Sequence, residues 1–272
     1  MPTTIPTTTS STRPGSPSTG DAYFETDTKD YIIYDGASWR SYVSDGSFAS
    51  GSFASNSYSA SFDGVNDYIG TNNKFDFIQQ TCDFSIVCWV KFTNYTSTSA
   101  NQAILATNYT GSQKGFYLFY DNRSNNKTLR TLFRAGSSSD ISVNNAVSDN
   151  DWFHVAVTCA AGGTQKLYVD GSVIGSTAAP TTTTDSAYHN MTLGVALVSA
   201  VTPTYFFGGN LDEVAVFNRE LTSSEIDNIR ATPYSYIKYT SLYRLENNAD
   251  DEAGANNGTN NGATFVTSTK PY

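Results

Sequence analysis

The stretch "WFHVAVTC" (152–159), followed shortly by "KLYVDGSVIGS" (166–176), decides the fold. Both pieces are short and rich in Val, aromatic and Thr residues that favour a pleated, half-buried surface. Asp170-Gly171 lies between two apolar runs and is a favoured two-residue hairpin turn. The stretch therefore predicts antiparallel strands joined by tight turns.

Similar short strands continue on both sides of this stretch, from Ser59 onward, with turn signals every ten or so residues. This spacing favours an antiparallel sandwich. The helix signal is "LTSSEIDNIRA" (221–231), in which Thr222 and Glu225 form a capping box. We therefore expect an all-β fold with one short helix. The further predicted strands are "SASFDGVNDYI", "DFSIVCWVKF", "QAILATNY", "GFYLFYD", "TLRTLFRAG", "MTLGVAL" and "NLDEVAVFNREL".

Five segments carry a family resemblance. They are "SFDGVNDYI" (61–69), "FSIVCWVK" (84–91), "WFHVAVT" (152–158), "KLYVDGSVIGS" (166–176) and "LDEVAVFNRELTSSEI" (211–226). In that order they resemble successive signatures of laminin G-like domains of the concanavalin A-like lectin/glucanase superfamily. The resemblance implies a concanavalin A-like antiparallel β-sandwich, or jelly roll.

The end of the chain resembles the beginning of such a domain. In the family, a segment similar to "LYRLENNADDEAGANNGTNNGATFV" (242–266) stands first, whereas here it stands last. The first and last strands of such a sandwich lie close together, so a circular permutation costs little free energy. We expect residues 59–272 to form the sandwich, with its first strands supplied by 236–272 and with 242–245 and 263–266 in the sheets. Alternatively, the segment completes a neighbouring subunit by domain swapping, or is a truncated second repeat, which would leave sheet edges unpaired.

The front of the chain reads as an attachment region. Residues 1–20 are rich in Thr, Ser and Pro and predict an extended arm. Residues 21–45 predict a β meander with strands at 22–26, 31–34 and 39–43. So small a sheet usually needs packing against another chain, which indicates an assembly element. Residues 46–58, with the tandem "GSFAS" repeat, predict a linker.

A second resemblance covers "RPGSPSTGDAYFETDTKDYIIYDGASW" (13–39). It is similar to a short module in structural proteins of tailed bacteriophages, notably those of marine cyanobacteria. It implies a virion protein, made in the host cytoplasm and displayed on the virion surface as a decoration, fibre or knob. Residues 1–45 would bind other virion proteins, and the sandwich would bind host-surface glycans. A purely architectural role and a cellular glycan-binding adhesin are the alternatives, and a trimer is the expected assembly.

Charge and hydropathy exclude other partners. Asp and Glu number 25 against 16 Lys and Arg, which gives a net charge of −9, and no basic cluster is present. Nucleic acid is therefore not expected as a partner. No apolar run of about 18 residues predicts a membrane span, and residues 1–20 lack the apolar core of a signal peptide. Cys82 and Cys88 lie too far apart along one predicted strand to form a disulfide.

Catalysis is not expected. The resemblance implies that glucan-cleaving relatives carry two glutamates flanking an aspartate at alternate positions, and this chain has no such spacing. Asp212 and Glu213 are adjacent, so a regular strand would place them on opposite faces, where they cannot act together. His154 lies within a predicted strand, where a structural role is favoured, and His189 lies in a loop. No G-x-S-x-G turn is present.

Two kinds of ligand site are considered. Asp250, Asp251 and Asn257 offer oxygen ligands for calcium, the ion that the resemblance implies, and Gly254 permits a tight turn. Asx turns explain the same residues without a metal, and no other cofactor is required. For glycans, the aromatic candidates are Tyr95, Tyr109, Tyr188 and Tyr205, although such residues also serve as packing groups.

Overall fold

The computed structural model describes residues 7–9, 11–18, 21–25, 31–34, 39–41, 56–93, 101–107, 114–121, 126–184, 190–199, 202–231 and 239–271. These residues divide into two compact units, one before Asn56 and one from Asn56 onward. Tyr95, Tyr109, Tyr188 and His189 lie outside the described residues. No described helix is long and apolar enough to cross a membrane.

The first unit is a small sheet in the order β1 (Thr7–Thr8), β2 (Ala22–Glu25), β3 (Tyr31–Tyr34), β4 (Trp39–Ser41). The strands β2, β3 and β4 are successive antiparallel neighbours. The strand β1 was not expected: it pairs in parallel with β2, so part of the region predicted as an extended arm belongs to the sheet. The connection from β1 to β2, residues 9–21, is long enough for a parallel return. Within this connection the Thr12 carbonyl accepts a hydrogen bond of 2.9 Å from Thr8 Oγ1.

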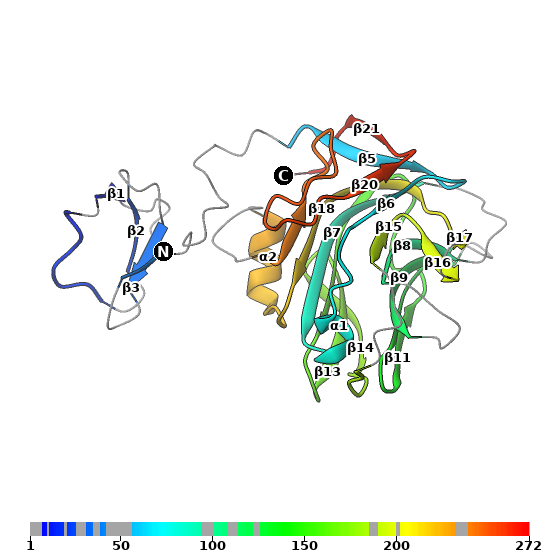
Figure 1. Ribbon diagram of the computed structural model, residues 1–272, viewed down its shortest axis with the longest axis horizontal. Coiled ribbons are helices and arrows are strands. Elements are labelled where there is room, and N and C mark those ends of the chain that lie inside the picture. Colours follow the sequence, from blue (N-terminus) through cyan, green and yellow to red (C-terminus); the bar gives the residue numbers. More distant parts are fainter. Residues whose placement is uncertain are drawn as a thin grey trace. The chain divides into compact units, whose positions relative to one another are not determined.

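The second unit is a sandwich of two large sheets, which confirms the predicted all-β jelly-roll class (Figure 1). A small hairpin of β16 (Ala196–Ser199) and β17 (Thr202–Thr204) accompanies them. The seven-stranded sheet has the order β11 (Ser138–Val143), β10 (Thr128–Arg134), β9 (Gly115–Asp121), β8 (Gln102–Thr107), β15 (Met191–Leu193), β6 (Tyr68–Gly70) and β20 (Thr259–Asn261).

The eight-stranded sheet contains "WFHVAVTC" (152–159) and "KLYVDGSVIGS" (166–176). Asp170 and Gly171 both have positive φ, at 49° and 84°, as the tight turn between two hairpin strands requires. The order is β14 (Ser172–Ala178), β13 (Thr164–Val169), β12 (Trp152–Cys159), β7 (Phe84–Phe92), β18 (Gly208–Phe217), β5 (Tyr58–Asp63) and β21 (Thr264–Thr267), with β19 (Ser241–Tyr243) beside β18.

The C-terminal segment takes part in both sheets of its own chain. The strand β20 pairs with β6, and β21 pairs with β5. Along one edge of β18, β5 pairs with the first part of the strand and β19 with the last part. Between these two partners lies Asp212-Glu213, where the pairing of β18 with β7 also shifts register. This gap in the ladder positions the charged cluster described below.

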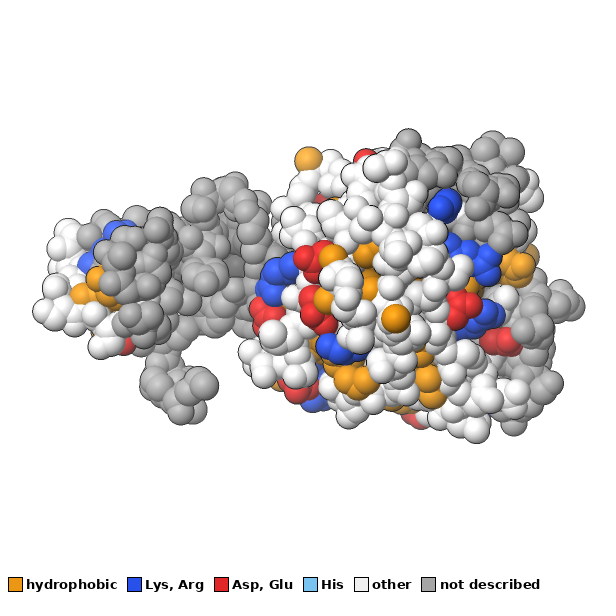
Figure 2. Space-filling model, turned by 90° about the horizontal axis from the view of Figure 1, so that it is seen from below, with side chains coloured by type: hydrophobic (Ala, Val, Ile, Leu, Met, Phe, Trp, Pro, Cys, Tyr) orange, Lys and Arg blue, Asp and Glu red, His pale blue; other side chains and the backbone are white. Residues whose placement is uncertain are grey.

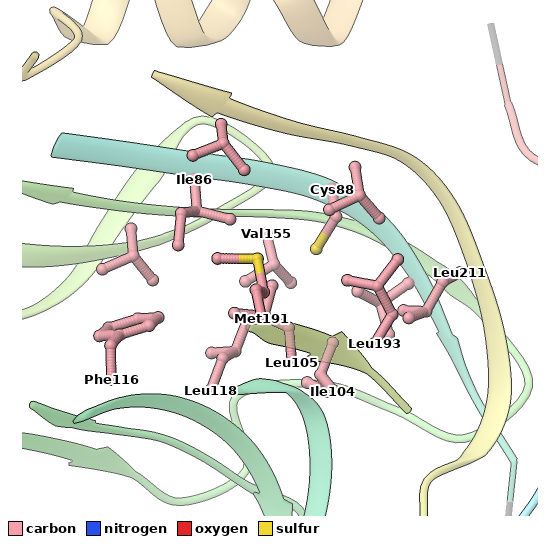
Figure 3. Close-up of a cluster of buried hydrophobic side chains, with 14 of the residues drawn as sticks. Ile86, Cys88, Ile104, Leu105, Phe116, Leu118, Val155, Met191, Leu193 and Leu211 are labelled. Carbon is pink, nitrogen blue, oxygen red and sulfur yellow. The ribbon is translucent and has the colours of Figure 1, made fainter. Parts of the chain in front are cut away.

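The core lies between the two sheets and is formed by alternate residues of each strand. Ile86 and Val155 of the eight-stranded sheet are buried with Leu105, Leu118 and Met191 of the seven-stranded sheet (Figure 3). Each such aliphatic side chain stabilises the fold by about 1.5–3 kcal/mol when removed from water. The free thiols of Cys82, Cys88 and Cys159 are buried, and burial raises the pKa of the Cys88 thiol to about 12.

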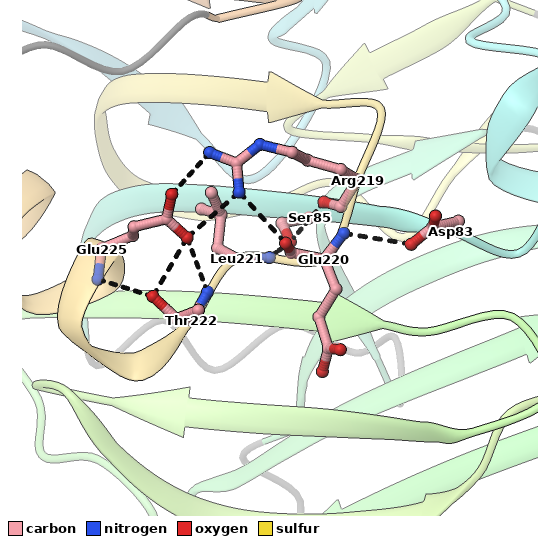
Figure 4. Close-up of polar contacts among 7 residues, drawn as sticks. All are labelled: Asp83, Ser85, Arg219, Glu220, Leu221, Thr222 and Glu225. Carbon is pink, nitrogen blue, oxygen red and sulfur yellow. Dashed lines mark hydrogen bonds and ion pairs between the residues drawn. The ribbon is translucent and has the colours of Figure 1, made fainter. Parts of the chain in front are cut away.

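The helix α2 (Ser223–Ala231) lies beside β18 and β7 (Figure 1). Its capping box is confirmed, because the Glu225 N–H donates to Thr222 Oγ1 at 3.2 Å and the Thr222 N–H donates to Glu225 Oε2 at 2.8 Å. Arg219 binds the same carboxylate at 2.7 Å and lowers the Glu225 pKa to about 2 (Figure 4). Ile226 and Ile229 are the buried positions. A further short helix, α1 (Phe77–Gln80), was not expected.

Candidate functional site

An aromatic cluster lies on the face of the seven-stranded sheet that points away from the core. Along β9, Phe116, Leu118 and Tyr120 belong to the core, whereas Tyr117 and Phe119 point to the opposite face. We call Tyr117, Phe119 and Tyr205, with Leu132 and the small residues Ala103, Ala106 and Ala196, the outer aromatic cluster.

The rings of the outer aromatic cluster are mutually fixed. Tyr117 and Phe119 stack with centroids 5.0 Å apart and planes 13° apart. Tyr205 meets Phe119 edge-on at 6.0 Å. Tyr117 and Phe119 are almost fully buried, whereas Tyr205 and Leu132 are only partly buried. The accessible part of the cluster is therefore its border, where an aromatic ring and an aliphatic side chain face solvent.

Charged groups flank this border. On β10 the side chains alternate, so that Leu129 and Phe133 enter the core while Arg130, Leu132 and Arg134 are half-buried on the outer face. Arg130 forms a half-exposed ion pair of 3.4 Å with Asp140 of β11. An apolar ring next to guanidinium groups is a combination suited to sugar faces and to hydroxyl or carboxylate groups.

Only part of this cluster was predicted from the sequence. Tyr205 was among the candidates, and it lies in the cluster with a positive φ of 59°. Tyr117 and Phe119 were missed, although "GFYLFYD" places aromatic residues at both alternating sets of positions. That doubling indicates a strand that is apolar on both faces, and is the available signal for an outer cluster.

The predicted calcium residues surround a tight loop after β19. Asp251 is buried, and its Oδ1 accepts hydrogen bonds from the N–H groups of Leu242 at 2.9 Å and Gly254 at 3.1 Å. Its Oδ2 accepts one from the Ser241 hydroxyl at 2.8 Å. Asn257 Oδ1 accepts from the Asp251 N–H at 3.1 Å. The Asp251 carboxylate thus closes the loop by accepting protein donors.

Asp250, the third calcium candidate, makes a separate local contact. Asp250 is exposed, and its N–H donates to Asn248 Oδ1 at 3.1 Å. Within the described residues, no group of three or more His, Cys, Asp and Glu side chains is arranged to hold a metal ion. Calcium binding by Asp250, Asp251 and Asn257 stays a prediction, and N–H groups aimed at Asp251 oppose a cation there.

One sequence prediction about the carboxylates is wrong. Asp212 and Glu213 were expected on opposite faces of a strand, yet both reach the ammonium group of Lys270, Asp212 Oδ2 at 3.1 Å and Glu213 Oε1 at 2.9 Å. The cause is an irregularity in β18. Glu213 has a positive φ of 49°, and the register with β7 shifts between Asp212 and Ala215, which rotates Glu213 to the side of its neighbour.

His154 is a packing residue in the structure. It is buried on β12 and lies edge-on to Trp89, with ring centroids 5.3 Å apart. Burial and the positive charges of Arg230 and Lys270 lower its pKa to about 3. A neutral imidazole held in this way cannot exchange protons near neutral pH.

Figure 2 shows one face of the molecule, on which acidic and basic side chains are interspersed among uncharged polar groups.

The decisive comparison is with protein families: a model described as the concanavalin A-like lectin/glucanases superfamily matches residues 62–227, more than half of the chain. The chain belongs to the concanavalin A-like lectin/glucanases superfamily.

Solved structures of the concanavalin A-like fold agree. A proposed carbohydrate binding protein from Bacteroides ovatus matches with a TM-score of 0.61 and 17% identity, over 94% of this chain and 71% of that one. The heptameric SAP-like pentraxin of Limulus polyphemus matches with a TM-score of 0.54 and 13% identity, over 79% of this chain and 96% of that one. The CBM40 domain of the Ruminococcus gnavus IT-sialidase matches with a TM-score of 0.50 and 19% identity, over 63% of this chain and 97% of that one. No curated protein matches. At these identities the likeness shows the fold alone.

Proposed function

We propose that this concanavalin A-like protein binds glycans without catalysing a reaction, and that the outer aromatic cluster borders the binding surface. The observation that carries the proposal is the stacked pair Tyr117–Phe119 with the partly buried Tyr205 on a face of the sandwich that core packing does not need. Carbohydrate-binding names among structures of the same fold support it.

The aromatic groups would pack against the apolar face of a sugar ring, and Arg130 and Arg134 would donate hydrogen bonds to the oxygens of that sugar. Such contacts are individually weak. Several copies displayed together would bind a host surface by avidity. A glycan array that includes neutral and carboxylate-bearing sugars tests the proposal. Binding to at least one class supports it, and a folded sandwich that binds none contradicts it.

The non-enzymatic part of the proposal rests on the carboxylates. Asp212 and Glu213 lie buried against Lys270, with Asp212 fully buried, so they are not presented to a sugar. His154 is neutral and buried. A sugar-release assay on every glycan bound in the array tests this part. Release above a blank reaction would contradict it.

We further propose that the chain is displayed on a tailed-phage virion, attached through residues 1–45. The motif in residues 13–39 supports this, and the first unit is a sheet of four short strands, which is small for independent stability. Attachment to other virion proteins would supply the missing packing. A purely architectural role is the second candidate, favoured if arrays find no ligand while the protein is present in particles. Mass spectrometry of purified particles tests virion location, and absence from them would contradict it.

The copy number is a separate proposal. A trimer is expected from the slender arm and small sheet, while the heptameric pentraxin of similar fold supports a larger oligomer as the alternative. Native mass spectrometry of the full chain distinguishes these outcomes. A stable monomer would contradict both.

A further inference from the structure

Lys270 is buried in the sandwich with its ammonium nitrogen between two carboxylates. The exposed fraction of its side chain is 1%, against 0% for Asp212 and 5% for Glu213. Nζ lies 3.1 Å from Asp212 Oδ2 and 2.9 Å from Glu213 Oε1. Lysine and aspartate are rarely buried to this extent. These three side chains form what we call the Lys270 cluster.

The fold builds the Lys270 cluster at considerable local cost. The irregular turn of β18 at Glu213, with its positive φ, brings two adjacent carboxylates to one side of the strand. A left-handed conformation at a residue other than glycine is strained, and persists where surrounding structure enforces it. The C-terminal segment after β21 then carries Lys270 into the gap between β5 and β19.

Neighbouring polar groups hold both carboxylates in place. Asn56 Nδ2 donates to Asp212 Oδ1 at 3.1 Å and to Glu213 Oε1 at 2.8 Å. Ser268 Oγ donates to Asp212 Oδ2 at 3.1 Å. Across the strand pair from Asp212 lies Trp89, which is buried and apolar over most of its surface. The cluster is thus rigid and shielded from water.

Burial disfavours charge on this cluster. It raises the pKa of Asp212 to about 7 and lowers that of Lys270. Two buried carboxylates and one buried ammonium would leave a net negative charge, so a proton on Asp212 relieves it. An amine and a carboxylic acid held in contact, next to a second carboxylate, are the reactants for amide formation.

We propose that Lys270 and Asp212 become joined by an amide bond between their side chains, with Glu213 transferring the protons. The reaction starts from the protonated Asp212 acid, the Lys270 ammonium and the Glu213 carboxylate. Glu213 takes one proton from Nζ, and the freed electron pair of Nζ attacks Asp212 Cγ. The C–N bond forms, and Glu213 relays a second proton from Nζ to the hydroxyl of Asp212. The C–OH bond then breaks, the hydroxyl leaves as water, and Glu213 stays protonated.

The balance of this step is complete. One ammonium, one carboxylic acid and one carboxylate give one amide, one water and one protonated Glu213, with no change in total charge and no oxidant or reductant. Fixed geometry supplies the effective concentration that makes such a reaction possible without activation of the acid. The same burial that makes the ion pair costly favours the uncharged amide.

The amide would join the C-terminal segment to the centre of β18. If force or heat separated β21 from β5, the separation could not extend past Lys270, because the amide would join this residue covalently to Asp212. Closing a loop in this way restricts the unfolded chain, as a disulfide does, but this bond would resist reducing agents. A protein that adheres to a surface is pulled when that surface moves, and such a covalent link would limit its unfolding.

Intact mass spectrometry of the purified full chain tests the inference. The expected mass is one water below that of the sequence. After tryptic digestion under denaturing conditions, we expect a linked species that joins peptides 167–219 and 245–272, which contain Asp212 and Lys270 respectively. Fragmentation should place the link at these two residues. A folded chain at full mass, without the linked species, overturns the proposal.

Three variants make the test specific. Lys270→Arg keeps the charge but removes the amine, and Glu213→Gln keeps the shape but removes the proton acceptor; both should show full mass and lose the linked species. Lys166→Arg is the matched control, because Lys166 forms a partly exposed ion pair of 3.0 Å with Glu220, and it should retain the link.

Each remaining outcome counts against the proposal. Water loss that persists in Lys270→Arg would place the dehydration at another aspartate. Loss of ammonia instead of water would assign the bond to Asn56. A link that forms equally in folded Glu213→Gln would remove Glu213 from the mechanism. Should either variant fail to fold, the linked peptide of the unmodified sequence still decides the question.

Discussion

Asp251 accepts a hydrogen bond from the Ser241 hydroxyl at 2.8 Å, and so connects the loop before β20 to the strand β19. The same carboxylate accepts from the N–H of Leu242, which ties it to the next residue of that strand. Because the group is buried, these donors replace the hydrogen bonds that water would otherwise make to it. The loop between β19 and β20 is therefore organised around one side chain.

Replacing this carboxylate should destabilise the sandwich. Asp251→Asn loses the charge and turns one acceptor into a donor that faces N–H groups. We expect a loss of about 2–4 kcal/mol in the free energy of unfolding. Asp250→Asn is the matched control, because Asp250 is exposed, and should change it by less than about 0.5 kcal/mol. Urea unfolding measures both, and equal effects would contradict the assigned role.

Calcium should not alter the stability of the sandwich through this loop. The N–H groups of Leu242 and Gly254 on Asp251 Oδ1, and the Ser241 hydroxyl on Oδ2, point their positive ends at the position that a cation would need. Thermal unfolding in excess Ca²⁺ and in EDTA should therefore give the same Tm. A Tm that rises with Ca²⁺ in the unmodified chain but not in Asp251→Asn would instead establish the metal site.

His154 should make the fold sensitive to acid. Its pKa in the folded protein is lowered from 6.5 to about 3, so between these values the unfolded chain binds a proton that the folded chain does not. Stability from this group is therefore full above pH 6.5 and falls as the pH decreases, by up to about 1.4 kcal/mol per pH unit.

His154→Phe should remove this part of the pH dependence while keeping a ring against Trp89. Chemical unfolding of both proteins between pH 7 and pH 4 makes the comparison. Any Asp212 that has not formed the amide titrates in the same range with the opposite sign, because its pKa is raised to about 7, and it does so in both proteins. Parallel stability curves would contradict the role of His154.

The capping box should stabilise α2 measurably. Thr222→Ala removes the hydroxyl that accepts the Glu225 N–H, and should cost about 1 kcal/mol. Ser224→Ala is the control. Ser224 is exposed in the first turn of the helix, and its replacement should have little effect. Differential scanning calorimetry measures both changes. A loss in Ser224→Ala as large as that in Thr222→Ala would contradict the cap.

The regular parts of this fold could be predicted from local signals. The hairpin at Asp170-Gly171 and the box at Thr222 and Glu225 appear where the sequence placed them, because each depends on residues within a few positions of one another. The short helix at 77–80 and the parallel pairing of Thr7–Thr8 depend on tertiary contacts, and the sequence carries no signal for either.

The candidate sites were harder to predict for two physical reasons. Alternation assigns faces only if the strand is regular, and nothing in "LDEVAV" indicates that Glu213 adopts a left-handed φ. Strand β9 is aromatic on both faces, so its pattern cannot tell whether Tyr117 or Phe116 enters the core. Both sites became visible only when neighbouring strands were placed.

Glycan binding at the border of the outer aromatic cluster should depend on Tyr205. Isothermal titration with an array-selected glycan measures this dependence in Tyr205→Ala and, as the matched control, in Tyr58→Ala on β5 of the other sheet, where the side chain is exposed. We predict that Tyr205→Ala weakens binding about tenfold or more, equivalent to about 1.4 kcal/mol, while Tyr58→Ala leaves it unchanged. Equal affinity of the folded Tyr205→Ala variant and the unmodified chain would contradict the claim.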